Sequence, residues 1–320
     1  MKKAGVSAGW YNLIVDVLGL LILLTIGLAL GWAILVIFTA WTLAHPARRT
    51  YGWAVSRALP GDPSELTNAN LEWCSWVFRA RGLDLPVWEI TGHDPMGPVV
   101  ILTHGWGDSR VSMLGSGRVE GVLPAVSRLI VWDLPGHGDA PGWCTLGIHE
   151  PEMLKELIER VGGGDRPMVV WGFSLGARVS VLASANNQSV LGVVAEAPYL
   201  LISTPARNVL RLRGLPYRFN LWPALWLIRQ CAGKSMASVR SPLSAEKLEV
   251  PLLVLHGEGD LIAPIEDGRA LAAGTRAGQL VVIDGGAHQS MFYDERTKDT
   301  ARHELRRFLM ETYRGSVSQR

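Results

Sequence analysis

The sequence is poor in cysteine. It has three cysteines in 320 residues, Cys74, Cys144 and Cys231, and they form no C-x-x-C pair and no His/Cys pattern with metal-ligand spacing. An odd number leaves at least one thiol free, which argues against a disulfide framework. We interpret the three as buried structural thiols. No side-chain cluster has metal-ligand spacing, so we expect no catalytic metal and no cofactor.

The sequence also lacks an excess of charge of either sign. Its 31 basic and 29 acidic residues leave a formal net charge of +2. Nucleic-acid binding normally needs a concentrated basic surface, so we expect no nucleic-acid partner. A length of 320 residues with 48% hydrophobic side chains suits one large α/β domain with an accessory segment.

Charge is absent altogether from residues 17–44, "VLGLLILLTIGLALGWAILVIFTAWTLA". As a helix, this run would span about 42 Å, enough for one tilted crossing of a hydrocarbon core of about 30 Å. A cleaved signal peptide has an apolar region of only ~7–15 residues, and a core helix of this length is unusual. We therefore predict an N-terminal transmembrane anchor over residues 1–44, in a single-pass membrane protein.

The charges that flank this run do not decide the orientation of the anchor. Lys2 and Lys3 precede it, and Arg48, Arg49 and Arg57 follow it, so the counts on the two sides are nearly equal. The side of the membrane on which the rest of the chain lies stays open.

After a polar, proline-broken linker over residues 45–70, strands alternate with helices. Residues 71–78 and 83–90 predict a hairpin at a sheet edge. Buried-type strands are predicted at 98–105, 128–133, 167–174, 190–198, 251–260 and 279–288, and helices at 151–161, 265–273 and 294–313. This alternation predicts an α/β domain over residues 71–320, with a mostly parallel sheet flanked by helices.

The central motif is Gly172-Phe173-Ser174-Leu175-Gly176, which follows the strand at 167–174 and precedes a helical pattern. A strand, tight turn and helix with a serine at the bend form a nucleophile elbow. We predict Ser174 as the nucleophile. Gly172 and Gly176 are expected because side chains there would collide in the turn.

Two further polar residues follow later strands. Asp260 follows "LLVLHGEG" and His288 follows "VVIDGGA", so the chain order is Ser, Asp, His, which accompanies a nucleophile elbow. The histidine would remove the serine proton and the carboxylate would orient the histidine. Backbone N–H groups of Leu175 and of Trp106, in "HGWGDS", are expected to stabilise the oxyanion.

On the segments "THGWGDS", "DLPGHGDA", "GFSLGA", "HGEGDLIAP" and "GGAHQSM", the chain resembles the α/β-hydrolase fold superfamily from about residue 71 to 313. Within it, the chain is similar to the lysophospholipase, monoacylglycerol-lipase and serine-aminopeptidase-like group, which includes membrane-anchored members. The resemblance implies the roles given above for Ser174, Asp260 and His288. It does not specify the substrate.

Other polar residues at strand ends have plainer interpretations. His104, His256 and His137 are expected to shape turns, and Asp108 to cap the helix that follows it. Glu196 is the alternative to Asp260 as the acid, since some hydrolases carry their acid on that strand.

Residues 199–247 form the expected helical cap insert. From residue 199 to 245 there is no acidic residue, and aromatic residues are interleaved with basic ones. The basic residues are Arg207, Arg211, Arg213, Arg218, Arg229, Lys234 and Arg240. Such a surface suits contact with anionic lipid; the alternative is a cap whose aromatics pack on the domain and whose arginines are solvated.

The sequence thus predicts a membrane-anchored serine hydrolase that cleaves an ester, thioester or amide, with a hydrophobic or lipid-derived ester favoured. Its partners would be a small-molecule or lipid-like acyl substrate and the membrane. The alternatives are a serine peptidase or amidase of the same fold, and a non-catalytic scaffold. Oligomeric state is not predicted.

Overall fold

A computed structural model of the chain describes residues 5–66, 71–162, 168–233 and 242–317. Its centre is an eight-stranded sheet in the order β1-β2-β4-β3-β5-β6-β7-β8. Strand β2 pairs antiparallel with β1 and β4, and every other pairing is parallel. The strands are β1 (Trp73–Ala80), β2 (Leu83–Thr91), β3 (Val99–Thr103), β4 (Arg128–Trp132), β5 (Met168–Phe173), β6 (Val190–Glu196), β7 (Leu252–Gly257) and β8 (Gly278–Ile283).

The strands agree with the pattern in the sequence. The predicted edge hairpin is β1 and β2, and each predicted buried-type strand forms within one or two residues of its expected start. Strands β3, β5 and β7 are buried along their whole length, which explains their continuous apolar runs. The mostly parallel α/β architecture is therefore confirmed.

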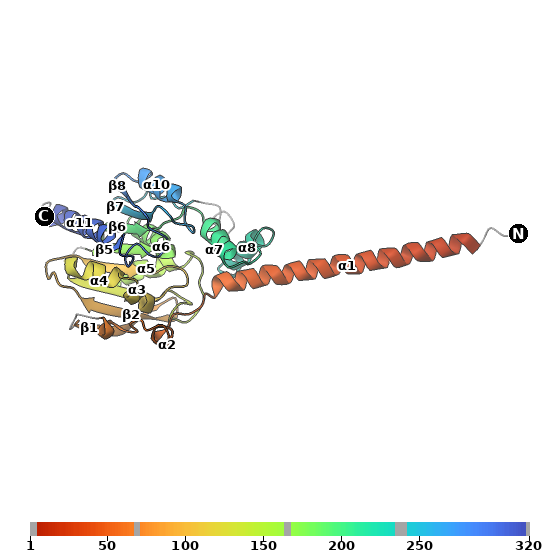
Figure 1. The fold of residues 1–320 in the computed structure, drawn as a ribbon, viewed down its shortest axis with the longest axis horizontal. Helices are drawn as coiled ribbons and strands as arrows, with labels where there is room; N and C mark the ends of the chain where they lie inside the picture. The colour runs from red at the N-terminus through yellow and green to blue at the C-terminus, as the bar shows by residue number, and fades with distance from the viewer. Residues whose placement is uncertain (1–4, 67–70, 163–167, 234–241, 318–320) are drawn as a thin grey trace.

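Helices cover both faces of the sheet (Figure 1). One hydrophobic cluster lies under α5, α6 and α10, and the other lies under α3, α4 and α11. The helices are α1 (Gly5–Ala44), α2 (Tyr51–Val55), α3 (Arg110–Gly115), α4 (Arg118–Val122), α5 (Glu150–Val161), α6 (Leu175–Ser184), α7 (Ser203–Leu212), α8 (Leu221–Cys231), α10 (Ile265–Ala273) and α11 (Lys298–Val317), with short 3₁₀ turns at Pro63–Glu65 and Leu123–Ala125.

Helix α1 extends far from the domain as a single rod (Figure 1). Among the described residues it is the one helix long and apolar enough to cross a membrane, over Trp10–Ala44. From Trp10 to Ile34 its large apolar side chains are exposed, for example Leu23 at 68% and Leu28 at 68%. Exposed apolar surface on this scale marks a site of contact with a membrane or with another protein.

The last turns of α1 have a different environment. Val36, Ala40, Leu43 and Ala44 are buried in the hydrophobic cluster that also contains side chains of β3, β5 and α6, and α1 packs on α8. The side-chain amide of Asn220 donates to the hydroxyl of Thr39 at 2.6 Å, between two buried residues. Helix α1 is therefore docked on the domain at its C-terminal end rather than joined to it by a loose linker.

The expectation of three buried thiols was wrong for two of them. Cys144 is buried, whereas Cys74 and Cys231 are exposed. Cys74 lies near the start of the edge strand β1, and Cys231 is the last residue of α8. Residue spacing gives no indication of either position.

Two histidines buried beside the sheet make the stability of the fold depend on pH. Burial lowers the pKa of His137 to about 4 and lowers the pKa of His104 well below its ordinary value. The unfolded chain therefore binds more protons than the folded chain between about pH 6.5 and 4, so stability is lost as the pH falls through this window.

We predict that His137→Asn weakens this dependence. The asparagine amide can keep the donation to the Pro135 carbonyl, which His137 makes through Nδ1 at 3.0 Å, but it does not titrate. The measurement is the thermal midpoint from pH 7.5 to 4.5. The variant should lose less stability than the wild type, by up to about 1.4 kcal/mol per pH unit; equal slopes would refute the assignment.

Candidate active site

Ser174 lies on a sharp bend between β5 and α6. Its backbone φ is +54°, a conformation that non-glycine residues rarely adopt, and its N–H donates to the carbonyl of Glu196 at 2.8 Å. The bend turns the chain directly from strand to helix, so the serine hydroxyl is presented at the carboxyl edge of the sheet. Strain of this kind is typical of functional turns.

The two glycines of the motif are required by close backbone contacts. A Cβ at Gly172 would lie 2.0 Å from the carbonyl oxygen of Gly176, and a Cβ at Gly176 would lie 2.1 Å from the carbonyl oxygen of Thr103. Neither contact can be relieved by a side-chain movement, because each involves backbone atoms. The motif therefore has the steric basis expected from the sequence.

His288 lies between Ser174 and Asp260. Its Nε2 is 3.0 Å from the hydroxyl oxygen of Ser174, and its Nδ1 is 2.7 Å from Oδ2 of Asp260. The three side chains come from loops after β5, β7 and β8, whose carboxyl ends meet at one edge of the parallel sheet. The structure thus brings together the three residues that the sequence singled out.

Asp260 is held as a carboxylate. Burial raises its pKa, but hydrogen bonds from His256 and His288 outweigh burial and hold the pKa well below its usual range. Its Oδ1 also accepts the backbone N–H groups of Ile262 and Ala263, at 2.8 and 2.9 Å. A charged, fully oriented carboxylate fixes the histidine with Nδ1 protonated and Nε2 free to accept a proton.

The two residues whose backbone amides are proposed as oxyanion donors both lie beside Ser174. Leu175 is the first residue of α6, where a helix leaves its N–H without a partner, and Trp106 belongs to the loop after β3. In the part of the chain that the structure describes, neither amide donates to a protein acceptor. Both residues line the same cavity as Ser174 and His288.

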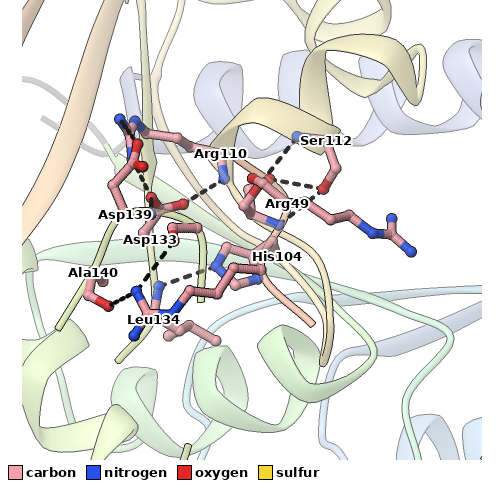
Figure 2. A network of polar contacts seen from close by, with 11 residues as sticks. Arg49, His104, Arg110, Ser112, Asp133, Leu134, Asp139 and Ala140 are labelled. Carbon is pink, nitrogen blue, oxygen red and sulfur yellow. Dashed lines mark hydrogen bonds and ion pairs between the residues drawn. The ribbon is translucent and has the colours of Figure 1, made fainter. Parts of the chain in front are cut away.

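A polar network supports the start of α3, directly after the Trp106 loop (Figure 2). The guanidinium of Arg110 pairs with the buried Asp133 and with Asp139, and Asp133 also accepts the backbone N–H of Arg110 at 2.7 Å. His104 accepts the N–H of Leu134 through Nε2 at 3.0 Å. These bonds join the loops after β3 and β4, so His104 has the turn-shaping position expected of it.

Glu196 makes an ion pair of its own. Its carboxylate binds the guanidinium of Arg118 through two oxygens, one of them 2.9 Å from Nε, and both side chains are buried. The Arg118 guanidinium lies 4.2 Å from the ring centroid of Phe173, which in turn lies 5.1 Å from that of His288. Glu196 is therefore linked to the site through Arg118 and Phe173, whereas Asp260 contacts the histidine directly.

The cap on α3 differs from the expectation. Ser109 is the N-cap, with its hydroxyl accepting the N–H of Ser112, whereas Asp108 forms an ion pair with Arg49. The prediction that Asp108 caps this helix was wrong by one residue. Asp108 instead pairs with Arg49, 59 residues earlier in the chain, and no local sequence pattern predicts this ion pair.

A cavity of about 600 Å³ opens over the serine, a size typical of sites for small organic ligands. Its walls include the end of α1, the Trp106 loop, α7 of the cap, and the two loops that carry Asp260 and His288. Wall residues that the sequence analysis did not predict include Leu43, Ala47, Arg49, Trp53, Val209, Leu212 and Leu261. The walls are mostly apolar, as an acyl chain requires.

Comparisons with known proteins agree with this geometry. The family model "Alpha/beta hydrolase family" matches residues 100–303. The chain is 26% identical to human Protein ABHD12B over 197 residues (60% of this chain, 53% of the relative) and 25% identical to the bovine lysophosphatidylserine lipase ABHD12 over 210 residues (61% and 50%). It thus spans about half the length of these curated relatives.

Among solved structures, a Pyrococcus furiosus esterase superposes with a TM-score of 0.64 over 84% of this chain and 98% of that one, at 19% sequence identity. At this identity the likeness concerns the fold alone. The eight-stranded sheet, the bend at Ser174 and the matched family model together lead to one conclusion: the chain belongs to the alpha/beta hydrolase family.

Proposed function

We propose that this protein is a membrane-anchored serine hydrolase that cleaves a hydrophobic or lipid-derived ester. The observation that carries the proposal is the position of the His288 ring, 3.0 Å from the Ser174 hydroxyl and 2.7 Å from Asp260. A serine is a weak nucleophile unless a base removes its proton, and this arrangement supplies an oriented base.

In the proposed mechanism, the Ser174 hydroxyl attacks the substrate carbonyl while its proton passes to Nε2 of His288. Asp260 stabilises the imidazolium through Nδ1–H. The amides of Trp106 and Leu175 donate to the oxyanion. The imidazolium then protonates the leaving alcohol, and an acyl group stays on Ser174. Water, deprotonated by His288, releases the acid and restores the serine.

Membrane anchoring by α1 rests on its exposed apolar length. The cap extends this surface, because Phe219, Trp222 and Trp226 are exposed at 81%, 43% and 47% beside the end of α1. Aromatic side chains at this level suit the interface between lipid and water. Of the basic cap residues, Arg229 is buried and is therefore not part of this exposed surface. Lys234 and Arg240 lie outside the described residues.

The substrate class is proposed from the walls of the cavity. Apolar side chains line most of it, which favours an acyl chain, and Arg213 lines it with a guanidinium 4.9 Å from the Trp106 ring centroid. A single-chain lipid with an anionic head group fits both features. The lysophosphatidylserine lipase among the relatives acts on such a lipid by its name, which supports this choice over a peptide or amide.

The first test is covalent labelling of the full-length chain with a fluorophosphonate probe. We expect the wild type to be labelled and Ser174→Ala to lose the label completely, because the probe reacts with an activated serine hydroxyl. Ser180→Ala, which removes a buried hydroxyl from α6, the helix that follows Ser174, is the matched control and should stay labelled. A well-folded wild type that takes no label would favour the non-catalytic scaffold.

The second test separates the two candidate acids. Asp260→Asn should lower kcat by about 10⁴-fold, because the histidine loses the carboxylate that fixes its tautomer. Glu196→Gln should mainly lower stability, because it leaves the buried Arg118 without a counter-charge. Ester hydrolysis and thermal midpoints of both variants are compared. A larger loss of kcat in folded Glu196→Gln than in Asp260→Asn would reverse the assignment.

The third test concerns the head group. Arg213→Gln should lower kcat/KM about fivefold for a lysophospholipid with an anionic head group, since a partly exposed charge contact contributes about 1 kcal/mol. Hydrolysis of a neutral monoacylglycerol should change little. Arg218→Gln is the control, because Arg218 is an exposed cap arginine outside the cavity wall. Equal losses for both substrates would exclude head-group recognition by Arg213.

A further inference from the structure

We infer that the C-terminal end of the anchor helix forms part of the active site. The Leu43 carbonyl positions the loop of residues 104–109, here called the oxyanion loop, through the side chain of Trp106. This inference rests on the proposed function, because it assigns a role relative to the Trp106 amide. It goes further in treating α1 as part of the catalytic unit as well as a membrane attachment.

The first observation is the contact between the helix end and the indole. Nε1 of Trp106 donates to the carbonyl oxygen of Leu43 at 2.8 Å, and that carbonyl belongs to the last turn of α1. A helix leaves its last carbonyls without intrahelical partners, so the indole satisfies a group that would otherwise need water. Arg213, at the end of α7, lies over the same ring at 4.9 Å. Trp106 therefore lies between the anchor and the cap, and its hydrogen bond is to the anchor.

The second observation is that the chain after α1 follows the same loop. The Arg49 guanidinium pairs with Asp108, and the hydroxyl of Ser109 donates to the Arg49 carbonyl at 2.5 Å. Residues 43–49 therefore bind Trp106, Asp108 and Ser109, which are three of four consecutive residues of the oxyanion loop. Asp108 and Ser109 are buried, so these bonds lie away from competing water.

The third observation is that the helix end cannot move freely. Its buried face, with Ala40 at 6% and Leu43 at 2% exposure, packs in the domain core. The carbonyl of Ala44 accepts the N–H of Cys144 at 2.9 Å, and Arg48 donates to the carbonyl of Ala140 at 2.8 Å. Figure 1 shows α1 leaving the domain beside α7 and α8. A displacement of α1 at this point is transmitted to the loop.

Trp106 consequently has two roles in one residue. Its backbone N–H is the proposed oxyanion donor, and its side chain fixes where that N–H points. Loss of an oxyanion donor lowers rate by ~100- to 1000-fold, and a loosened donor should cost a part of that. Because the oxyanion forms only in the transition state, the loss should appear in kcat and hardly in KM.

The experiment measures kcat and KM for a water-soluble p-nitrophenyl ester, using full-length variants in detergent micelles. Trp106→Phe keeps an aromatic side chain and the backbone amide but removes the indole N–H donor. Ala40→Leu adds volume where α1 is docked. Ala29→Leu makes the same change on the exposed part of the helix and is the matched control.

We expect Trp106→Phe and Ala40→Leu each to lower kcat about tenfold with KM within about twofold, and Ala29→Leu to match the wild type. The Ala40→Leu effect should vanish in the Trp106→Phe background, since both act through one bond. Additive effects, or an unchanged kcat in Trp106→Phe alone, would overturn the inference. Absence of Ser174-dependent hydrolysis in the wild type would instead refute the proposed function.

Discussion

The close approach of backbone to backbone at the Ser174 bend is the constraint on which the rest of the site depends. The carbonyl oxygens of Gly176 and Thr103 occupy the volume that a Cβ at Gly172 or Gly176 would need. Only with this packing does β5 turn directly into α6, so that the serine hydroxyl faces His288 and the Leu175 amide starts a helix. The bend is also fixed from the neighbouring strand, because Ser174 N–H donates to the carbonyl of Glu196.

The environment below the bend explains why a charged pair is buried there. Arg118 and Glu196 are almost inaccessible, and burying two charges costs free energy that their attraction must offset. The pair also helps to position the rings of the site, because the Arg118 guanidinium packs on Phe173 and Phe173 packs beside the His288 ring. Arg118 gives the Glu196 carboxylate a counter-charge and hydrogen-bond donors that are separate from the histidine. The pair thus leaves Asp260 as the carboxylate in contact with His288.

Much of this arrangement could be predicted from the sequence, because its causes are local or topological. Apolar runs and turn residues gave the strands, and a parallel sheet collects the ends of β5, β7 and β8 at one edge, so Ser174, Asp260 and His288 meet. Contacts that depend on exact three-dimensional packing could not be predicted. Asp108 looked like a helix cap until the structure showed Arg49 beside it, and nothing in the spacing of Leu43 and Trp106 indicates their hydrogen bond.

The docking of α1 relates the proposed membrane anchor to the proposed reaction. A flexible linker would leave the catalytic domain free to rotate above the bilayer, and the cavity would face lipid only part of the time. Here a buried hydrogen bond joins α1 to Asn220 of the cap, a partly buried one joins its last turn to Trp106, and α8 holds its aromatic side chains beside the same helix. The orientation of the cavity relative to α1 is therefore set by the fold. For a substrate whose acyl chain resides in the bilayer, this removes the orientational search that a loosely tethered enzyme must repeat at each encounter.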